Sequence, residues 1–114
     1  MSQFAWFDLR TEDAKSAEGF YTALLGWGVV NEGDMPPMFA GPDGPWALIG
    51  GAPLPGGSQW LPYIRVDELD KATEKAKQLG AKVIQEKAQG PAGTFTAIAD
   101  PTGAPVVLWQ PAAA

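Results

Sequence analysis

Hydrophobic residues recur along this chain with two spacings, one typical of strands and one typical of helices. In residues 4–10, FAWFDLR, successive side chains alternate between two faces, which predicts a strand. Phe7 and Leu9 share one face of this strand, and Trp6 and Asp8 share the other. The segment that follows carries apolar side chains three or four positions apart until a glycine ends the pattern, so it predicts an amphipathic helix.

The same order of elements then occurs a second time. Short apolar runs bounded by Gly, Pro and Asp predict seven further strands, and a second helix is predicted with Asp67 as its N-cap. The predicted strands cover residues 4–10, 27–31, 38–40, 46–49, 60–66, 82–86, 94–99 and 105–110, and the two helices end at Gly26 and Gly80. We expect an α+β fold of two βαβββ modules, residues 1–51 and 60–114, joined by a linker over residues 52–59.

An internal repeat supports this division. A shift of 54 residues places Trp6 on Trp60 and aligns the Leu-Gly pairs that end the two helices. The turns at residues 41–44 and 100–103 match with an offset of 59, so five residues (59 − 54) are inserted between the two matches. Because half of this chain is too short to bury a sufficient core, we expect one domain made of two modules.

Composition narrows the classes of function. The chain has 114 residues, of which 46% are hydrophobic and 18% charged, as expected for a folded globular domain. Eight basic and thirteen acidic residues give a net charge of −5, which disfavours nucleic acid and anionic membrane surfaces as partners. The start MSQFAWFD lacks the features of a signal peptide and no apolar run reaches membrane-spanning length, so we expect a cytoplasmic protein.

The repeat and its motifs resemble one known superfamily. The residues that carry the likeness are Asp13 with Phe20-Tyr21 and Leu25-Gly26-Trp27, residues 66–70 before the second helix, and Asp100-Pro101-Thr102-Gly103 before the last strand. In this order they resemble the vicinal oxygen chelate superfamily, which includes glyoxalase I, bleomycin resistance proteins and extradiol dioxygenases. The resemblance implies curled mixed sheets around a shared cavity, one helix outside each sheet, and a homodimer.

Enzymes of this superfamily hold a divalent metal with a His or similar residue from the first strand of a module and a Glu from its last strand. The sequence contains no His and no Cys. The first-strand positions correspond to Trp6 and Leu61 (or Trp60), and the last-strand positions to Val107 and Leu48. None of these side chains is a metal ligand, so the sequence predicts no metal cofactor. A divalent metal held by displaced carboxylate ligands is the alternative.

Continued alternation predicts which side chains line the cavity. The predicted ligand-binding residues are Trp6, Asp8, Trp46, Leu48, Leu61, Tyr63, Arg65, Val107 and Trp109. They would form an aromatic-walled pocket for a small aromatic or amphipathic molecule. Asp8 either orients a polar group of the ligand or pairs with Arg10 or Arg65. The alternative is that the tryptophans fill the cavity themselves.

Three hypotheses for function follow. The first is a binding protein of the bleomycin-resistance kind that takes a small molecule without a metal and has no catalytic residue. The second is a lyase, isomerase or dioxygenase of the same superfamily with displaced oxygen ligands. The third is an interaction protein whose function resides in a dimer surface. Fold alone does not decide between them, because this superfamily hosts many reactions.

Overall fold

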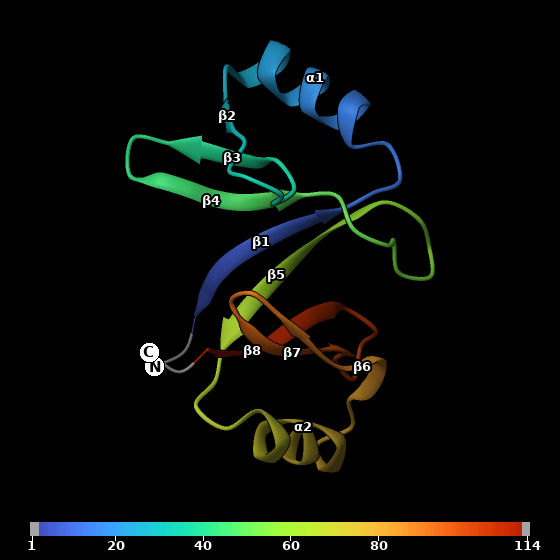
Figure 1. Cartoon of the computed structure of the whole chain (residues 1–114). Helices are drawn as coiled ribbons and strands as arrows, with labels where there is room; N and C mark the ends of the chain where they lie inside the picture. The colour runs from blue at the N-terminus through green and yellow to red at the C-terminus, as the bar shows by residue number, and fades with distance from the viewer. Residues whose placement is uncertain (1–2, 113–114) are drawn as a thin grey trace. The chain divides into compact units, whose positions relative to one another are not determined.

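The structure, a computed structural model, describes residues 3–112 and contains the predicted elements in the predicted order (Figure 1). Within these residues there are eight strands and two helices, which confirms the α+β class. The elements are β1 (Phe4–Arg10), α1 (Ala14–Leu25), β2 (Gly28–Val30), β3 (Met38–Gly41), β4 (Gly44–Ile49), β5 (Gln59–Arg65), α2 (Leu69–Gln78), β6 (Lys82–Gly90), β7 (Gly93–Ala99) and β8 (Pro105–Pro111).

The chain divides into two compact units, residues 6–61 and residues 62–112 with 3–5. In the first unit the strand order is β2-β3-β4-β1, and in the second it is β5-β8-β7-β6. Each unit pairs its first strand with its last in parallel, β1 with β4 and β5 with β8, and its other neighbours antiparallel. The βαβββ repeat is thus present in both halves.

The strand registers define which positions of the two halves correspond. Asp8 pairs with Leu48 in the first unit, and Tyr63 pairs with Val107 in the second. When the last strands are matched at the offset of 59 that the turns give (107 − 48), these pairs place the first strands 55 residues apart (63 − 8). Leu48 is the structural counterpart of Val107, as the turn motifs indicate.

The offset of 55 residues between the first strands corrects the match of Trp6 with Trp60 in the sequence repeat. Trp6 corresponds to Leu61 and not to Trp60, so the identity of Trp6 and Trp60 at a shift of 54 is a coincidence of composition. The single extra residue matters because neighbouring positions of a strand face opposite sides of a sheet. Leu61 and Trp60 therefore belong to different surfaces.

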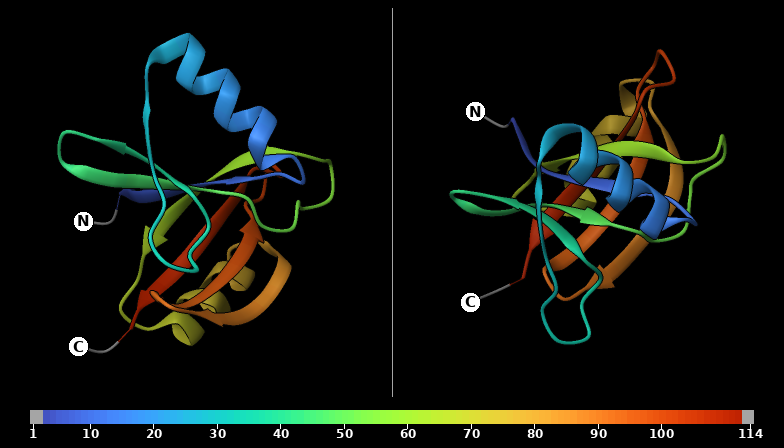
Figure 2. Two further views of the ribbon diagram at one scale, coloured as in Figure 1. Left: turned by 45° about the horizontal axis from the view of Figure 1, so that its top comes forward. Right: turned by 90° about the horizontal axis from the view of Figure 1, so that it is seen from above.

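The core of the first unit lies between α1 and one face of its strands (Figure 2). Its buried members are Leu9, Phe39, Ala47 and Ile49, and α1 adds Ala14, Ala17 and Tyr21. The helix begins at Ala14, because the carboxylate of the N-cap residue Asp13 accepts a hydrogen bond from the Ser16 N–H (3.1 Å). It ends at Gly26, which has a φ of 71°.

Helix α1 buries less of its apolar surface than its spacing predicts. Phe20, Leu24 and Leu25 are 57%, 62% and 51% exposed, and no residue of the helix is fully buried. Among the side chains of α1, Tyr21 makes most of the aromatic contacts. Its ring centroid lies 5.1 Å from that of Trp27 and 5.7 Å from that of Phe39. Helix α1 therefore contacts the core through Ala14, Ala17 and Tyr21, of which Tyr21 is the one aromatic side chain.

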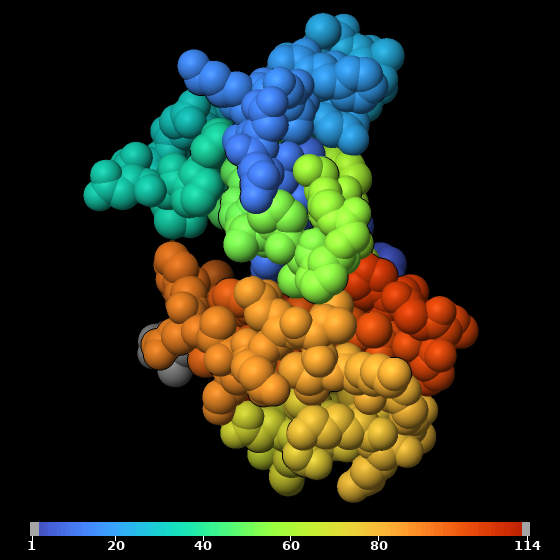
Figure 3. All heavy atoms as spheres, turned by 90° about the vertical axis from the view of Figure 1, so that its right-hand side faces the viewer, coloured from blue at the N-terminus to red at the C-terminus, as the bar shows by residue number. Residues whose placement is uncertain are grey.

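The core of the second unit lies between α2 and one face of β6, β7 and β8 (Figure 1). Leu69, Ile98 and Leu108 are its buried members. The outer surface of α2, yellow in Figure 3, is charged, with ion pairs between Lys71 and Glu68 and between Lys77 and Glu74 at 3.3 Å.

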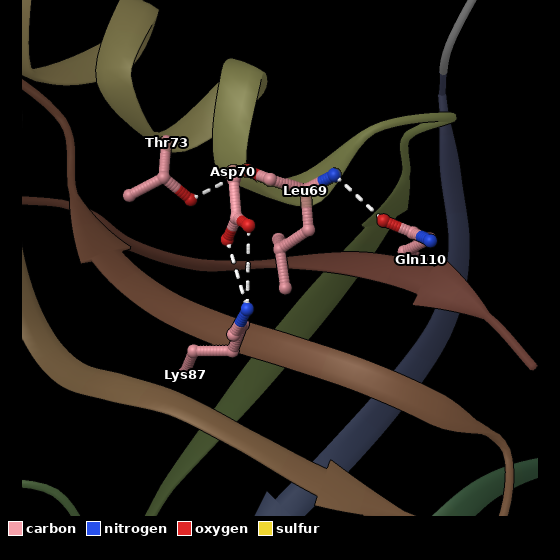
Figure 4. A network of polar contacts seen from close by, with 5 residues as sticks. All are labelled: Leu69, Asp70, Thr73, Lys87 and Gln110. Atoms are coloured by element: carbon pink, nitrogen blue, oxygen red, sulfur yellow. Dashed lines mark hydrogen bonds and ion pairs between the residues drawn. The ribbon is translucent and has the colours of Figure 1, made fainter.

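The start of α2 differs from the prediction. Glu68 and not Asp67 is the N-cap residue, and its side chain makes no capping hydrogen bond. Instead, the side-chain oxygen of Gln110 in β8 accepts a hydrogen bond from the Leu69 N–H at 2.8 Å (Figure 4). A residue 41 positions away thus replaces a local cap, because it satisfies one of the free N–H groups of the first turn.

Replacement of Gln110 by alanine should lower the free energy of unfolding by about 1 kcal/mol, because it removes this capping acceptor. Urea denaturation followed by far-ultraviolet circular dichroism measures the change. Gln78→Ala, at an exposed position near the end of α2, is the matched control and should change stability by less than about 0.5 kcal/mol. Equal effects of the two variants would contradict the capping role.

The turn before β8 is stabilised by one carboxylate. Oδ1 of Asp100 accepts hydrogen bonds from the hydroxyl and the N–H of Thr102 and from the N–H of Ala104, at 2.6, 2.8 and 3.0 Å. These bonds favour the charged form, and the Thr102 hydroxyl contributes most to lowering the pKa of Asp100 below its ordinary value of 3.8.

The lowered pKa of Asp100 predicts a pH dependence with a definite sign. Its stabilisation is complete above pH 3.8 and is lost as pH falls through the lower pKa of the folded state. Asp100→Asn should therefore flatten the loss of stability on acidification below this pH. A series of urea denaturation curves from pH 5 to pH 2 tests it, and identical slopes for both proteins would contradict the assignment.

The helices also bear on membrane insertion. Within residues 3–112, neither α1, with 12 residues, nor α2, with 10, is long and apolar enough to cross a membrane.

Candidate functional site

The face of the second unit opposite α2 carries residues that alternation assigns to the site. Tyr63 pairs with Val107, and Val107 pairs with Ala97 on its other side. The Tyr63 ring lies 6.3 Å from the ring of Phe95. Val107 has no exposed surface, and Tyr63 is 8% exposed. The neighbouring residues Ile64 and Leu108 belong to the core against α2, so Tyr63 and Val107 lie on the opposite face, and their role in ligand binding stays a prediction.

The other predicted residues of β5 and β8 share this parity. Leu61 is completely buried, whereas Arg65 is exposed. Trp109 is half-buried, and its indole N–H donates a hydrogen bond to the backbone oxygen of Ala92 at 3.0 Å. This bond gives Trp109 a structural partner within its own unit.

Asp8 forms a buried polar group in the first unit, on the face opposite α1. Its Oδ1 accepts a hydrogen bond from the indole N–H of Trp6 (3.0 Å), and its Oδ2 pairs with Nε of Arg10 (3.2 Å). The Asp8 and Arg10 side chains are only 8% and 7% exposed. Arg10 also donates to the backbone oxygen of Ala52 at 3.4 Å. Of the two roles predicted for Asp8, the structure contains the pairing with Arg10.

The predicted position of Trp46 is wrong, and a β-bulge is the reason. Phe39 pairs with Ala47, but the next residue of β3 pairs with Pro45, so Trp46 is an extra residue between two ladder pairs. A bulge interrupts alternation, and Trp46 therefore does not share the face of Leu48. Its ring packs on the α1 side, stacked against Phe39 with a centroid distance of 6.0 Å.

This displacement brings Trp46 into an aromatic pocket within the first unit, which we call the tryptophan pocket. Phe7, Trp27, Trp46 and Trp60 line it, and its volume is about 280 Å³. All four side chains are half-buried. The indole N–H of Trp60 donates to the hydroxyl of Tyr21 at 3.0 Å, which fixes one wall to α1.

The rings of the tryptophan pocket have a definite arrangement. The planes of Trp46 and Trp60 are 10° apart, with a centroid distance of 6.2 Å. The plane of Trp27 lies at 87° and 82° to these two, at 4.7 and 6.3 Å. Phe7 meets Trp46 edge to face at 6.3 Å and 77°. Rings at these distances contact one another, so the two nearly parallel indoles enclose no ligand-sized space between them, and the third indole packs perpendicular to both.

A larger hollow of about 500 Å³ adjoins the tryptophan pocket and shares Trp27 and Trp46 with it. The rest of its lining is glycine, proline and alanine from the end of α1, the start of β2 and the turn between β3 and β4, with Asp43 as its one charged residue. The shared indoles therefore separate an aromatic pocket from a more polar one.

The residues at the metal positions of the superfamily do not fit a divalent ion. Trp6, Leu48, Leu61 and Val107 offer no anionic or lone-pair donor, and the last two have no exposed surface. The nearby carboxylate of Asp8 is engaged by Arg10 and Trp6. Across residues 3–112, no three acidic side chains are grouped as a metal site requires.

Sequence reasoning missed much of the tryptophan pocket. In the sequence, Trp27 stands out only as part of a family motif, and Trp60 only as a repeat match and as the alternative to Leu61. Three of the five tryptophans line this one pocket. The high number of tryptophans in the chain is the feature of the sequence that points to an aromatic site.

Residues 5–109 match the Glyoxalase-like domain family, and the chain belongs to this family. The protein named "Putative glyoxylase CFP32" from Mycobacterium bovis is 37% identical over an alignment of 118 positions that covers 92% of this chain and 44% of that protein. The same values hold for the protein of this name from Mycobacterium tuberculosis. The chain thus spans less than half the length of these curated relatives.

Solved structures share the fold at low identity. Methylmalonyl-CoA epimerase from Mycobacterium tuberculosis is similar with a TM-score of 0.63 and 22% identity, over 96% of this chain and 88% of that one. The Mn(II)-bound glyoxalase from Novosphingobium aromaticivorans has a TM-score of 0.61 and 17% identity, over 96% of this chain and 40% of that one. The resemblance to the vicinal oxygen chelate superfamily is confirmed.

Proposed function

We propose that this chain binds a small aromatic or amphipathic molecule in its tryptophan pocket and that binding requires no metal. The observation that carries the proposal is a pocket whose lining consists of four half-buried aromatic side chains. Aromatic rings that keep part of their surface in water gain free energy when a flat or apolar ligand covers them. Recognition by such walls needs contact area and no Lewis acid.

Binding without a metal is expected from the residues at the positions that hold metal ligands in enzymes of the superfamily. Apolar side chains stand at all four of these metal-ligand positions, namely Trp6, Leu48, Leu61 and Val107. An ion placed among them would lose its water without gaining donors. We therefore expect binding to be unchanged after treatment with a chelator.

A fluorescence titration with N-phenyl-1-naphthylamine, a neutral aromatic amphiphile, tests the proposal. We expect saturable binding with a dissociation constant on the order of 0.1 mM, given the number of heavy atoms in the probe. Trp46→Leu should weaken binding at least tenfold, because it removes a wall of the pocket. Thermal denaturation of the variant checks that it remains folded.

Trp109→Leu is the matched control, since this indole lies in the second unit and outside the tryptophan pocket. It should leave the affinity unchanged. Loss of binding in Trp109→Leu with retention in Trp46→Leu would contradict the proposed site and favour the face opposite α2.

A metal-dependent enzyme of the same family is the second candidate. The name of the mycobacterial relatives, which contains the word glyoxylase, favours it. Elemental analysis of the purified protein distinguishes the two proposals. Stoichiometric Mn, Zn or Fe whose removal abolishes ligand binding would contradict the metal-free proposal and support an oxygen-ligated site.

A further inference from the structure

We infer that the ligand of this chain carries an uncharged oxygen acceptor, such as the carbonyl group of a ketone, an amide or an ester. This oxygen lies in the larger hollow beside the tryptophan pocket and accepts a hydrogen bond from the indole N–H of Trp27 or Trp46. The inference rests on the proposed function and names the chemical class of its ligand. Three features lead to it: the hydrogen bonds of the tryptophans, the lining of the hollow, and the charge of the first unit.

The tryptophans differ in whether their indole N–H has an acceptor. Those of Trp6, Trp60 and Trp109 each donate to an oxygen of the protein at 3.0 Å. The indole N–H groups of Trp27 and Trp46 have no acceptor among residues 3–112. Both side chains are half-buried, and no buried polar side-chain atom in the described part of the chain lacks a hydrogen-bond partner. The two indole nitrogens are therefore reached by solvent, and their N–H groups are available to a ligand.

Trp27 and Trp46 are also the two tryptophans that line the larger hollow, whose volume of about 500 Å³ is within the range of small-molecule sites. Their ring centroids are 4.7 Å apart, so a ligand lies beside these contacting rings and not between them. Glycine, proline, alanine and Asp43 form the rest of the lining. Among the side chains that line the hollow, the two indoles are thus the hydrogen-bond donors, and Asp43 is an acceptor.

This donor set favours a ligand that has both an apolar part and an oxygen acceptor. The apolar part gains free energy when it covers the half-buried rings. An oxygen that loses its water on binding needs a donor in exchange, and an indole N–H supplies one. A pure hydrocarbon would instead separate the indole N–H from water and give it no acceptor.

The charge of the first unit favours an acceptor that is itself uncharged. Residues 6–61 contain seven acidic and two basic residues, so the whole net charge of −5 (2 − 7) falls in this unit. Asp43 is the one charged residue in the lining of the hollow. Both would repel a carboxylate or a phosphate on the ligand, whereas a carbonyl oxygen accepts the same hydrogen bond without a charge.

The test compares acetophenone with ethylbenzene in titrations of the full chain, followed by the indole N–H signals in heteronuclear NMR spectra. The two molecules have nearly the same shape and differ in the carbonyl oxygen. We expect a dissociation constant on the order of 1 mM for acetophenone, about fivefold tighter than for ethylbenzene, as one net hydrogen bond provides. The signal of Trp27 or Trp46 should move further to lower field with acetophenone than with ethylbenzene, and Trp109 is the internal control.

The order of the two affinities decides the inference. If the carbonyl group met no donor, its lost hydration would make acetophenone the weaker ligand. Equal or tighter binding of ethylbenzene would therefore overturn the inference, and continued binding of N-phenyl-1-naphthylamine would leave the proposed function standing. Failure of acetophenone, ethylbenzene and N-phenyl-1-naphthylamine alike would overturn both.

The variants Trp27→Phe and Trp46→Phe each remove one indole N–H and keep an aromatic ring. At least one of them should reduce the ratio of the two affinities to about one, because the hydrogen bond contributes only to acetophenone. Lost contact area weakens both probes and leaves this ratio unchanged. Trp109→Phe, in the second unit, is the matched control and should retain the ratio of the wild type. An unchanged ratio in both pocket variants would contradict the assignment of the donors.

Benzoate tests the requirement for an uncharged acceptor. It should bind about fivefold or more weakly than acetophenone, because its carboxylate meets the negative charge of the first unit. Asp43→Asn should narrow this difference, since it removes the charged residue from the lining of the hollow. Tighter binding of benzoate than of acetophenone would overturn the inference of an uncharged ligand.

Discussion

Asp8→Ala should destabilise the protein by about 3 kcal/mol or more, as seen in a lower urea midpoint. The reason is that Arg10, whose side chain is 7% exposed, would lose a carboxylate at 3.2 Å. Removal of one member of a buried ion pair leaves a charge in a poorly solvated position. Trp6 would lose the acceptor of its indole N–H at the same time.

Asp70→Ala is the control for this prediction, because Asp70 pairs with Lys87 at a similar distance of 3.1 Å on the surface. These side chains are 80% and 52% exposed, so the change should be within about 1 kcal/mol. Similar losses in the two variants would show that burial does not decide the contribution of Asp8.

Asp8→Ala also bears on function. Asp8 lies on the face opposite α1, whereas the tryptophan pocket is on the α1 side. Under conditions where the variant is folded, its affinity for N-phenyl-1-naphthylamine should equal that of the wild type. A selective loss of affinity would return Asp8 to the ligand-orienting role that the sequence leaves open.

The second large effect is expected for Gly93→Ala, which should lower stability by about 3 kcal/mol or more. Gly93 is buried, has a φ of 135° and pairs with Pro111. A Cβ atom there would collide with the backbone of residues 110–112. Since these are backbone atoms of β8 and of the residue that follows it, the collision cannot be relieved by rotating a side chain.

Thermal denaturation measures the effect of Gly93→Ala, and we expect a decrease in Tm of roughly 10 °C or more. Gly19→Ala is the control, because a Cβ at this helical position meets nothing within 4 Å. It should leave Tm unchanged or raise it slightly, since alanine favours helix over glycine. A Gly93 variant as stable as the Gly19 variant would contradict the assigned geometry.

Much of the fold follows from local patterns. Alternation in residues 4–10, a carboxylate N-cap at Asp13 and a helix-ending Gly26 each predict an element that the structure contains. These signals are local because strand parity and helix capping depend on residues a few positions apart. The repeat adds the topology, since two halves with the same order of elements fold in the same way.

The candidate site was less accessible to such reasoning. Parity assigns Tyr63 and Val107 correctly to the face opposite α2, because β5 and β8 pair in unbroken register. It fails for Trp46, where a bulge shifts the pairing by one residue. Strand parity also does not predict which group accepts a hydrogen bond from the Leu69 N–H, and in the structure this acceptor is the side chain of Gln110 in β8.

The sequence by itself determined the class of fold, the family motifs and the absence of His and Cys from the superfamily's metal positions. These depend on residue identity and short spacings. Only the tertiary structure decided that Asp8 pairs with Arg10. It also decided that three tryptophans, one just before β2, one in β4 and one in β5, line one pocket. Bulges and contacts between distant strands arise from packing the whole unit, and no short window of sequence contains that information.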